Sequence, residues 1–125
     1  MVEKLRKAIL NREKVLLAVI HGGFLELRPF RDIDVAVYTG YSIPYEEELD
    51  FCEQLSLELT DIAGIYVDVR MLDYSPPRFR VSALSNCVVL VERYPRAFLL
   101  RASIQELDDI EKKASLVRGW IHGRG

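Results

Sequence analysis

The chain has 125 residues, half of them hydrophobic, and a formal net charge of −2 at pH 7. This length predicts a single domain over residues 1–125, with enough apolar side chains for a core. The net charge argues against bulk attraction to nucleic acid or to an anionic membrane, and no apolar run approaches the ~18 residues of a membrane span.

The N-terminal segment MVEKLRKAIL is charged and has helical spacing without the apolar region of a secretory signal, which favours a cytoplasmic protein. Cys52 and Cys87 lie inside apolar patterns, so we interpret them as structural thiols rather than as a disulfide or metal pair. The ten acidic residues from Asp32 to Asp68 are accompanied by no Lys or Arg. This acidic zone suits divalent cations and a charged partner, although a solvated helix face explains most of its residues equally well.

Hydrophobic periodicity predicts helices and strands in the order α-β-β-α-β-α-β-α. Helical patterns cover residues 2–12, 44–63, 75–84 and 98–120, and strand patterns cover 15–20, 32–37, 65–71 and 87–91. We expect an α/β (α+β) fold in which helices cover a small mixed sheet of about four strands.

The two longest predicted helices carry apolar stripes. In the helix that Pro44 opens, and that Gly64 is expected to cap, the stripe predicted to be buried is Leu49, Cys52, Leu55, Leu59 and Ile62. The terminal helix, which includes Trp120, is expected to serve the core, a homodimer interface or a partner complex.

One stretch, from Val15 to Val37, combines features that suit phosphoryl transfer. Gly22-Gly23 ends an apolar strand where bare backbone can approach a phosphate. Asp32 and Asp34 occupy alternate positions of the next strand and so share one of its faces. Asp68 lies in another apolar strand, and three carboxylates from adjacent strands can converge on a two-metal site.

These motifs resemble those of the minimal nucleotidyltransferases of the DNA polymerase β superfamily. The pattern is a hydrophobic strand with Gly-Gly, a loop, Asp32-Ile33-Asp34-Val35, and later Val67-Asp68-Val69. The resemblance implies the nucleotidyltransferase fold and Mg²⁺-dependent transfer of a nucleoside monophosphate, AMP from ATP being favoured over other NTPs, to a hydroxyl. It also implies a partner that brings this hydroxyl, because small members of the family resemble antitoxins paired with HEPN-domain ribonuclease toxins.

The same resemblance implies the roles of individual residues. Asp32, Asp34 and Asp68 would be the catalytic ligands of two Mg²⁺ ions, with Asp68 helping to deprotonate the acceptor hydroxyl. Gly22 and Gly23 would hold the triphosphate through their backbone N–H groups. Arg28 and Arg31 would reach the phosphates, or else remain solvated loop side chains.

Two further residues have open interpretations. Arg70 follows Asp68 on the same strand face and would pair with that carboxylate or contact the substrate. His21 is interpreted as a strand-end side chain, with a catalytic role as the alternative.

Two other classes of function are alternatives to an enzyme. A binding module that neutralises its partner without turnover is favoured by the lack of a serine after Gly22 and by the short loop, and disfavoured by the three intact acids. A nucleic-acid-binding domain has no basic stripe with interleaved aromatic residues to support it.

Overall fold

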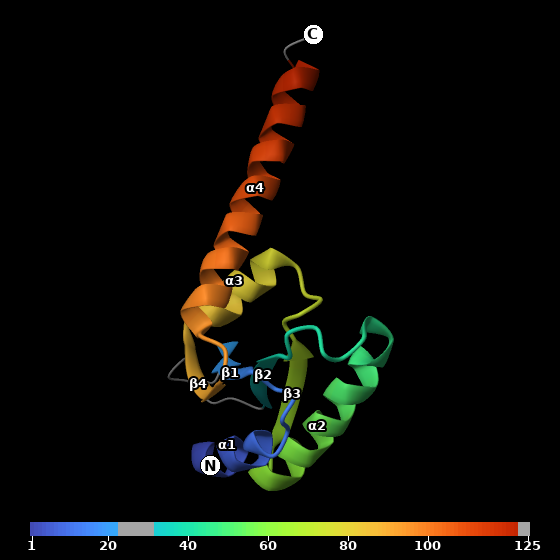
Figure 1. Cartoon of the computed structure of the whole chain (residues 1–125), viewed down its shortest axis with the longest axis vertical. Helices are drawn as coiled ribbons and strands as arrows, with labels where there is room; N and C mark the ends of the chain where they lie inside the picture. The colour runs from blue at the N-terminus through green and yellow to red at the C-terminus, as the bar shows by residue number, and fades with distance from the viewer. Residues whose placement is uncertain (23–31, 123–125) are drawn as a thin grey trace.

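The computed structural model describes residues 1–22 and 32–122, which form an α+β fold and confirm the predicted order of elements (Figure 1). The helices are α1 (Val2–Leu10), α2 (Glu48–Ala63), α3 (Pro77–Ser85) and α4 (Arg96–His122), with a 3-10 turn, η2 (Tyr45–Glu47), before α2. The strands are β1 (Leu17–His21), β2 (Asp32–Tyr38), β3 (Tyr66–Met71) and β4 (Cys87–Glu92).

The four strands form one mixed sheet in the order β3-β2-β1-β4. β1 pairs antiparallel with β2 and with β4, while β2 and β3 run parallel and place Asp34 beside Asp68. Among the described strands, β3 therefore lies at the edge of the sheet and pairs only with β2.

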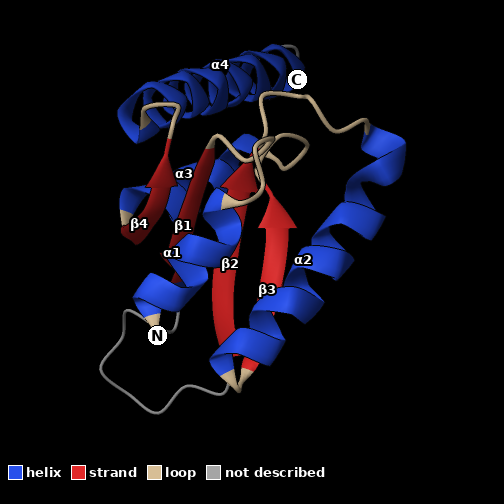
Figure 2. Cartoon of the chain, turned by 60° about the horizontal axis from the view of Figure 1, so that its bottom comes forward, coloured by secondary structure: helices blue, strands red, loops and turns tan. Residues whose placement is uncertain are grey.

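Helices cover both faces of the sheet, which divides the core in two. On one face, α1 and α2 pack against the side chains of Ile20, Val35 and Val67. On the other face, α3 and α4 pack against Leu17, Val19 and Ala36. Figure 2 shows α1 and α2 on the near side of the sheet with α3 behind it. Neighbouring residues of β2, such as Val35 and Ala36, enter opposite cores, which is the period of two that the sequence predicts.

α2 differs from the prediction at its start. The regular helix begins at Glu48, after η2, and Leu49 in its first turn is 80% exposed, so the prediction that Leu49 is buried is wrong. Leu55 and Leu59 are fully buried, and Cys52 and Ile62 are half-buried against the core. Gly64 ends the helix with a φ of 75°, which confirms the predicted C-cap.

A buried carboxylate, Asp73, fixes the end of the sheet opposite the paired acids. It accepts hydrogen bonds from the backbone N–H of Thr39 (3.0 Å) and of Tyr41 (2.7 Å), and from the Thr39 hydroxyl (2.9 Å). These bonds close the turn after β2, where Tyr41 has a φ of 63°.

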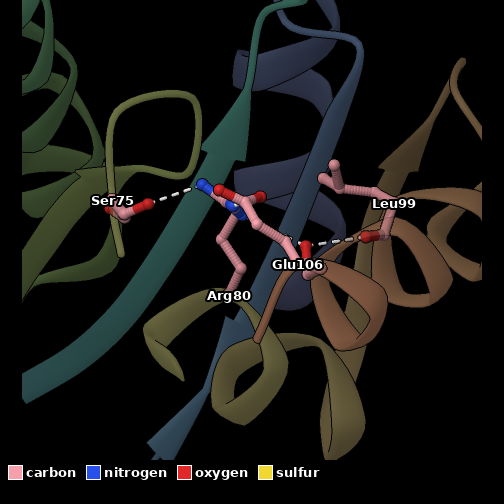
Figure 3. Close-up of polar contacts among 5 residues, drawn as sticks. Ser75, Arg80, Leu99 and Glu106 are labelled. Atoms are coloured by element: carbon pink, nitrogen blue, oxygen red, sulfur yellow. Dashed lines mark hydrogen bonds and ion pairs between the residues drawn. The ribbon is translucent and has the colours of Figure 1, made fainter. Parts of the chain in front are cut away.

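α4 is held at its base by Arg80 of α3 (Figure 3). Arg80 is 7% exposed and donates to the Ser75 carbonyl (2.5 Å), to the Ser103 hydroxyl (3.1 Å) and to the Glu106 carboxylate. Ser103 is the last buried residue in the described part of the chain, and beyond it α4 extends away from the sheet (Figure 1).

Much of the apolar stripe of α4 is therefore exposed, Ile104 and Ile110 to 49% each and Val117 and Ile121 to 56% each. The alternative in which the whole terminal helix serves the core is thus wrong beyond its first turns. Within residues 1–22 and 32–122, no helix is long and apolar enough to span a membrane.

Candidate functional site

The three predicted acids lie on one face of two neighbouring strands. Asp34 of β2 and Asp68 of β3 are directly paired in the parallel ladder, and Asp32 lies two residues before Asp34. Asp34 shares its face with Ala36, which packs toward α3 and α4. Asp34 and Asp68 are half-buried whereas Asp32 is exposed, so the acids line the open end of this face.

The carboxylates interact electrostatically. The pKa of Asp34 is raised above its ordinary 3.8, first because burial disfavours the charged form and then because Asp32 and Asp68 repel it. His21 and Arg70 act in the opposite direction. A divalent cation between these carboxylates would relieve the repulsion.

The donor set fits Mg²⁺, although the described residues do not form a closed cage. In that part of the chain, no three His, Cys, Asp or Glu side chains are placed to hold one ion. Carboxylate oxygens are the hard ligands that Mg²⁺ prefers, and Mg²⁺ commonly takes only one or two from the protein, with water and substrate phosphates completing its shell. An ion held by these acids would therefore need water or substrate phosphates to complete its shell.

Gly22 brings bare backbone against this site. It follows β1 with a φ of +76°, and a Cβ added to it would lie 2.8 Å from Oδ2 of Asp34. The left-handed backbone conformation favours glycine, and an added Cβ would displace the Asp34 carboxylate. Gly23, Arg28 and Arg31 lie outside the described residues.

His21 lies at the edge of the site rather than remote from it. It is paired with Asp34 across the β1–β2 ladder, and its Nε2 atom is buried without a hydrogen-bond partner among the described residues. Burial lowers the pKa of His21 from its ordinary 6.5, although Asp34 acts to raise it.

An aromatic ring joins His21 to Arg70. Phe79 of α3 meets the His21 ring edge-to-face at 5.5 Å, and the Arg70 guanidinium lies 5.2 Å from the centre of the same ring. Arg70 Nε is also 3.9 Å from Asp68 Oδ2, consistent with the predicted pairing. Phe79 carries no signal of this role in the sequence, because only its place after Pro76-Pro77, at the start of α3, distinguishes it.

The mixed sheet, its paired acids and the glycine beside them define a nucleotidyltransferase-type fold. The sequence from residue 3 to residue 96 matches the family described as "Polymerase beta, Nucleotidyltransferase", and the chain belongs to that family. Among curated proteins, none matches the sequence significantly.

Solved structures with similar folds include toxin–antitoxin complexes of MntA or MNT antitoxins. One is the complex of a tri-AMPylated Shewanella oneidensis HEPN toxin with an MNT antitoxin. It gives a TM-score of 0.67 at 14% identity, covering 98% of this chain and 99% of that chain. A toxin–antitoxin structure with AMP-PNP gives a TM-score of 0.70 at 14% identity, covering 95% and 98%. The MntA–HepT structure gives 0.65 at 14% identity, covering 94% and 97%.

Proposed function

We propose that this protein is a Mg²⁺-dependent nucleotidyltransferase that moves AMP from ATP to a hydroxyl on a partner protein. The observation that carries the proposal is the direct pairing of Asp34 with Asp68, with Asp32 on the same face, at the open end of the sheet. Burial first, and then the charges of Asp32 and Asp68, raise the pKa of Asp34, and a cation would relieve the repulsion between carboxylates at the same level of adjacent strands.

In this proposal Asp32, Asp34 and Asp68 hold two Mg²⁺ ions, and the backbone of Gly22 and Gly23 approaches the triphosphate. When bound, the ions would supply the positive charge that the triphosphate and the departing pyrophosphate require. Asp68 accepts the proton of the acceptor hydroxyl. The hydroxyl oxygen bonds to the α-phosphorus as the bond from phosphorus to pyrophosphate breaks. Arg28 and Arg31 are proposed to contact the phosphates.

The proposed partner is a helical HEPN-type protein that carries the acceptor hydroxyl. This part is supported by the similar folds, whose structures include an AMPylated HEPN toxin with its antitoxin and a complex with AMP-PNP. The exposed apolar residues along α4, which include Leu116 at 73%, offer a surface for such a partner or for a second copy of this chain.

A second candidate is a binding module that neutralises its partner without turnover. The outer part of α4 favours it, because partner docking there would not need the acids. Asp68→Asn discriminates between the candidates. It abolishes AMP transfer while leaving the complex intact if the protein is an enzyme, and it changes neither partner affinity nor neutralisation if the protein only binds.

Calorimetric titration with ATP, with and without Mg²⁺, tests the enzyme. We expect Mg²⁺-dependent ATP binding by the wild type and none by the Asp32→Asn/Asp34→Asn double variant. Asp50→Asn/Asp61→Asn, which removes two exposed acids of α2, is the matched control and should bind ATP like the wild type. Absence of nucleotide binding in all three proteins, even with Mg²⁺ and the partner present, would leave only the binding module.

A further inference from the structure

Six aromatic rings form a continuous run at the edge of the sheet where β2, β3 and β4 end. These three strands run in the same direction, so their carboxyl ends lie at one edge. Neighbouring rings have centroids 5.3–6.4 Å apart and meet tilted or edge-to-face. In spatial order the rings are those of Phe98, Tyr94, Tyr38, Tyr41, Tyr74 and Tyr45. The run holds five of the six tyrosines of the chain, so tyrosine is concentrated at this edge.

Tyr41, Tyr45 and Tyr74 form one end of the run, and we call them the tyrosine cluster. The Tyr74 ring is central, 5.7 Å from the Tyr41 ring and 5.3 Å from the Tyr45 ring, with interplanar angles of 74° and 84°. The Tyr74 hydroxyl donates to the Ile43 carbonyl (2.5 Å), which fixes the orientation of this central ring. Tyr41 is 59% exposed and Tyr45 69%. The cluster therefore presents oriented aromatic surface to solvent.

Tyr41 has a backbone conformation that rarely holds an aromatic residue. In the turn after β2, Gly40 and Tyr41 have φ angles of 65° and 63°, and Asp73 accepts a hydrogen bond from the Tyr41 N–H. A turn with positive φ at both central residues normally has Gly or Asn there, and a bulky residue is strained. Because the Tyr41 side chain is mostly exposed, burial in the core does not compensate for this strain. Strain of this kind is concentrated at functional sites, which points to a role for the exposed ring.

The charges around the tyrosine cluster are acidic. Desolvation raises the pKa of the Tyr74 hydroxyl above its ordinary 10.0, and three acids raise it further. They are Asp73, Glu46 and Glu48. Two of the three rings come from the stretch between Asp32 and Asp68, which has no Lys or Arg. A cation is attracted to the face of a tyrosine ring, and nearby carboxylates add to the attraction, so the cluster favours an organic cation.

We propose that the tyrosine cluster binds an arginine side chain of a partner protein. A guanidinium is planar and weakly hydrated, so it stacks on aromatic faces while its N–H groups reach carboxylates. Glu46 and Glu48 are the exposed and half-exposed acids beside the rings that would receive these groups. The proposal does not depend on AMP transfer, because the cluster lies beyond the end of β2 that is remote from Asp32.

Three peptides test the cluster on the whole protein without ATP or Mg²⁺. Each is a short Gly-Ser peptide whose central residue is Arg, Lys or citrulline, the uncharged isostere of Arg. NMR of protein labelled in its tyrosine rings and backbone amides reports where each peptide binds. We expect the Arg peptide to shift the resonances of the tyrosine cluster and to bind about tenfold more tightly than the citrulline peptide. The Lys peptide should bind more weakly than the Arg peptide, because an ammonium group does not stack.

Tyr45→Ala should weaken binding of the Arg peptide by about threefold. Its side chain is mostly exposed, so the fold should remain intact. Tyr66→Ala is the matched control, because Tyr66 is also exposed but is paired with Asp32 at the opposite end of β2. It should bind the Arg peptide like the wild type. Tyr41→Asn should also weaken binding while the protein stays folded, because Asn adopts a positive φ readily.

The proposal is overturned if the citrulline or the Lys peptide binds as tightly as the Arg peptide. It is also overturned if the shifts fall on the acids of β2 and β3 or along α4, or if Tyr45→Ala and Tyr66→Ala bind the Arg peptide equally well. Absence of ATP binding or of AMP transfer would contradict the proposed enzyme alone, because the peptide assay contains neither nucleotide nor metal.

Discussion

A side chain at Gly22 would collide with the carboxylate of Asp34, because a Cβ there would lie only 2.8 Å from Oδ2. Gly22 also has a φ of +76°, which costs other residues about 1–2 kcal/mol. We therefore expect Gly22→Ala to lower the free energy of unfolding by about that amount. We also expect it to weaken Mg²⁺-dependent ATP binding by displacing the acid, as measured by urea denaturation and calorimetry.

Gly64→Ala is a close control for this variant. Gly64 has nearly the same φ, +75°, but nothing lies within 4 Å of an added Cβ. It should reproduce the loss of stability and leave ATP binding unchanged. Equal ATP affinities for the two variants would show that the contact with Asp34 does not matter.

Asp34 is expected to destabilise the metal-free protein near neutral pH. Burial and the charges of Asp32 and Asp68 raise its pKa above 3.8, and an acid whose pKa rises on folding opposes folding while it is ionised. That penalty is present above the folded-state pKa and disappears as the pH falls through it toward 3.8. Asp34→Asn should therefore raise Tm near neutral pH and bring no gain in more acidic buffer.

Asp61→Asn, at an exposed position of α2, provides the comparison across the same pH series. It should not show a pH-dependent gain that disappears in the same range. A lower Tm for Asp34→Asn at neutral pH would contradict the repulsion described between the three acids.

Asp73→Asn is expected to destabilise the protein by about 2 kcal/mol. Asp73 is 3% exposed and accepts hydrogen bonds from three donors, whereas an Asn amide would turn an NH₂ group toward one of them. Chemical denaturation should show this loss. Asp50→Asn, on the exposed side of α2, should change the free energy of unfolding by no more than about 0.5 kcal/mol.

Replacing Arg80 by Met should cost about 2–3 kcal/mol, because the Ser75 carbonyl and the Glu106 carboxylate each lose a donor. Met keeps most of the apolar stem of the side chain. Arg78→Met is the control: its partner Glu111 lies 3.9 Å away and both side chains are exposed, so unfolding should change by less than about 0.5 kcal/mol. Similar losses for the two variants would mean that the Arg80 network adds little.

The sequence predicts the order of the helices and strands because the apolar residues of each element repeat with a helical or a strand period. β2 shows this most clearly. Ile33, Val35 and Val37 enter one core while Asp34 and Ala36 face the other helices, as alternation requires. The same alternation places Asp68 and Arg70 together on β3. The pairing of Asp34 with Asp68 depends on strand register, which only the folded sheet defines.

Other features depend on tertiary contacts, which hydrophobic periodicity does not predict. Leu49 continues the apolar stripe of α2, but it lines a surface hollow beside β3 and is 80% exposed. Asp73 and Arg80 resemble ordinary loop and helix-surface residues in sequence. They are buried because one closes the turn after β2 and the other joins α3 to α4.

The outer part of α4 would hold a bound partner close to the rest of the molecule. From Ser103 to His122 the helix runs for about 28 Å at 1.5 Å per residue. Under the proposed function, a partner bound along it would be tethered to the domain that carries the acids. Geometry rather than abundance would then set the local concentration of its hydroxyl, typically in the millimolar range. Transfer within such a complex would be unimolecular, so dilution would slow it only by dissociating the complex.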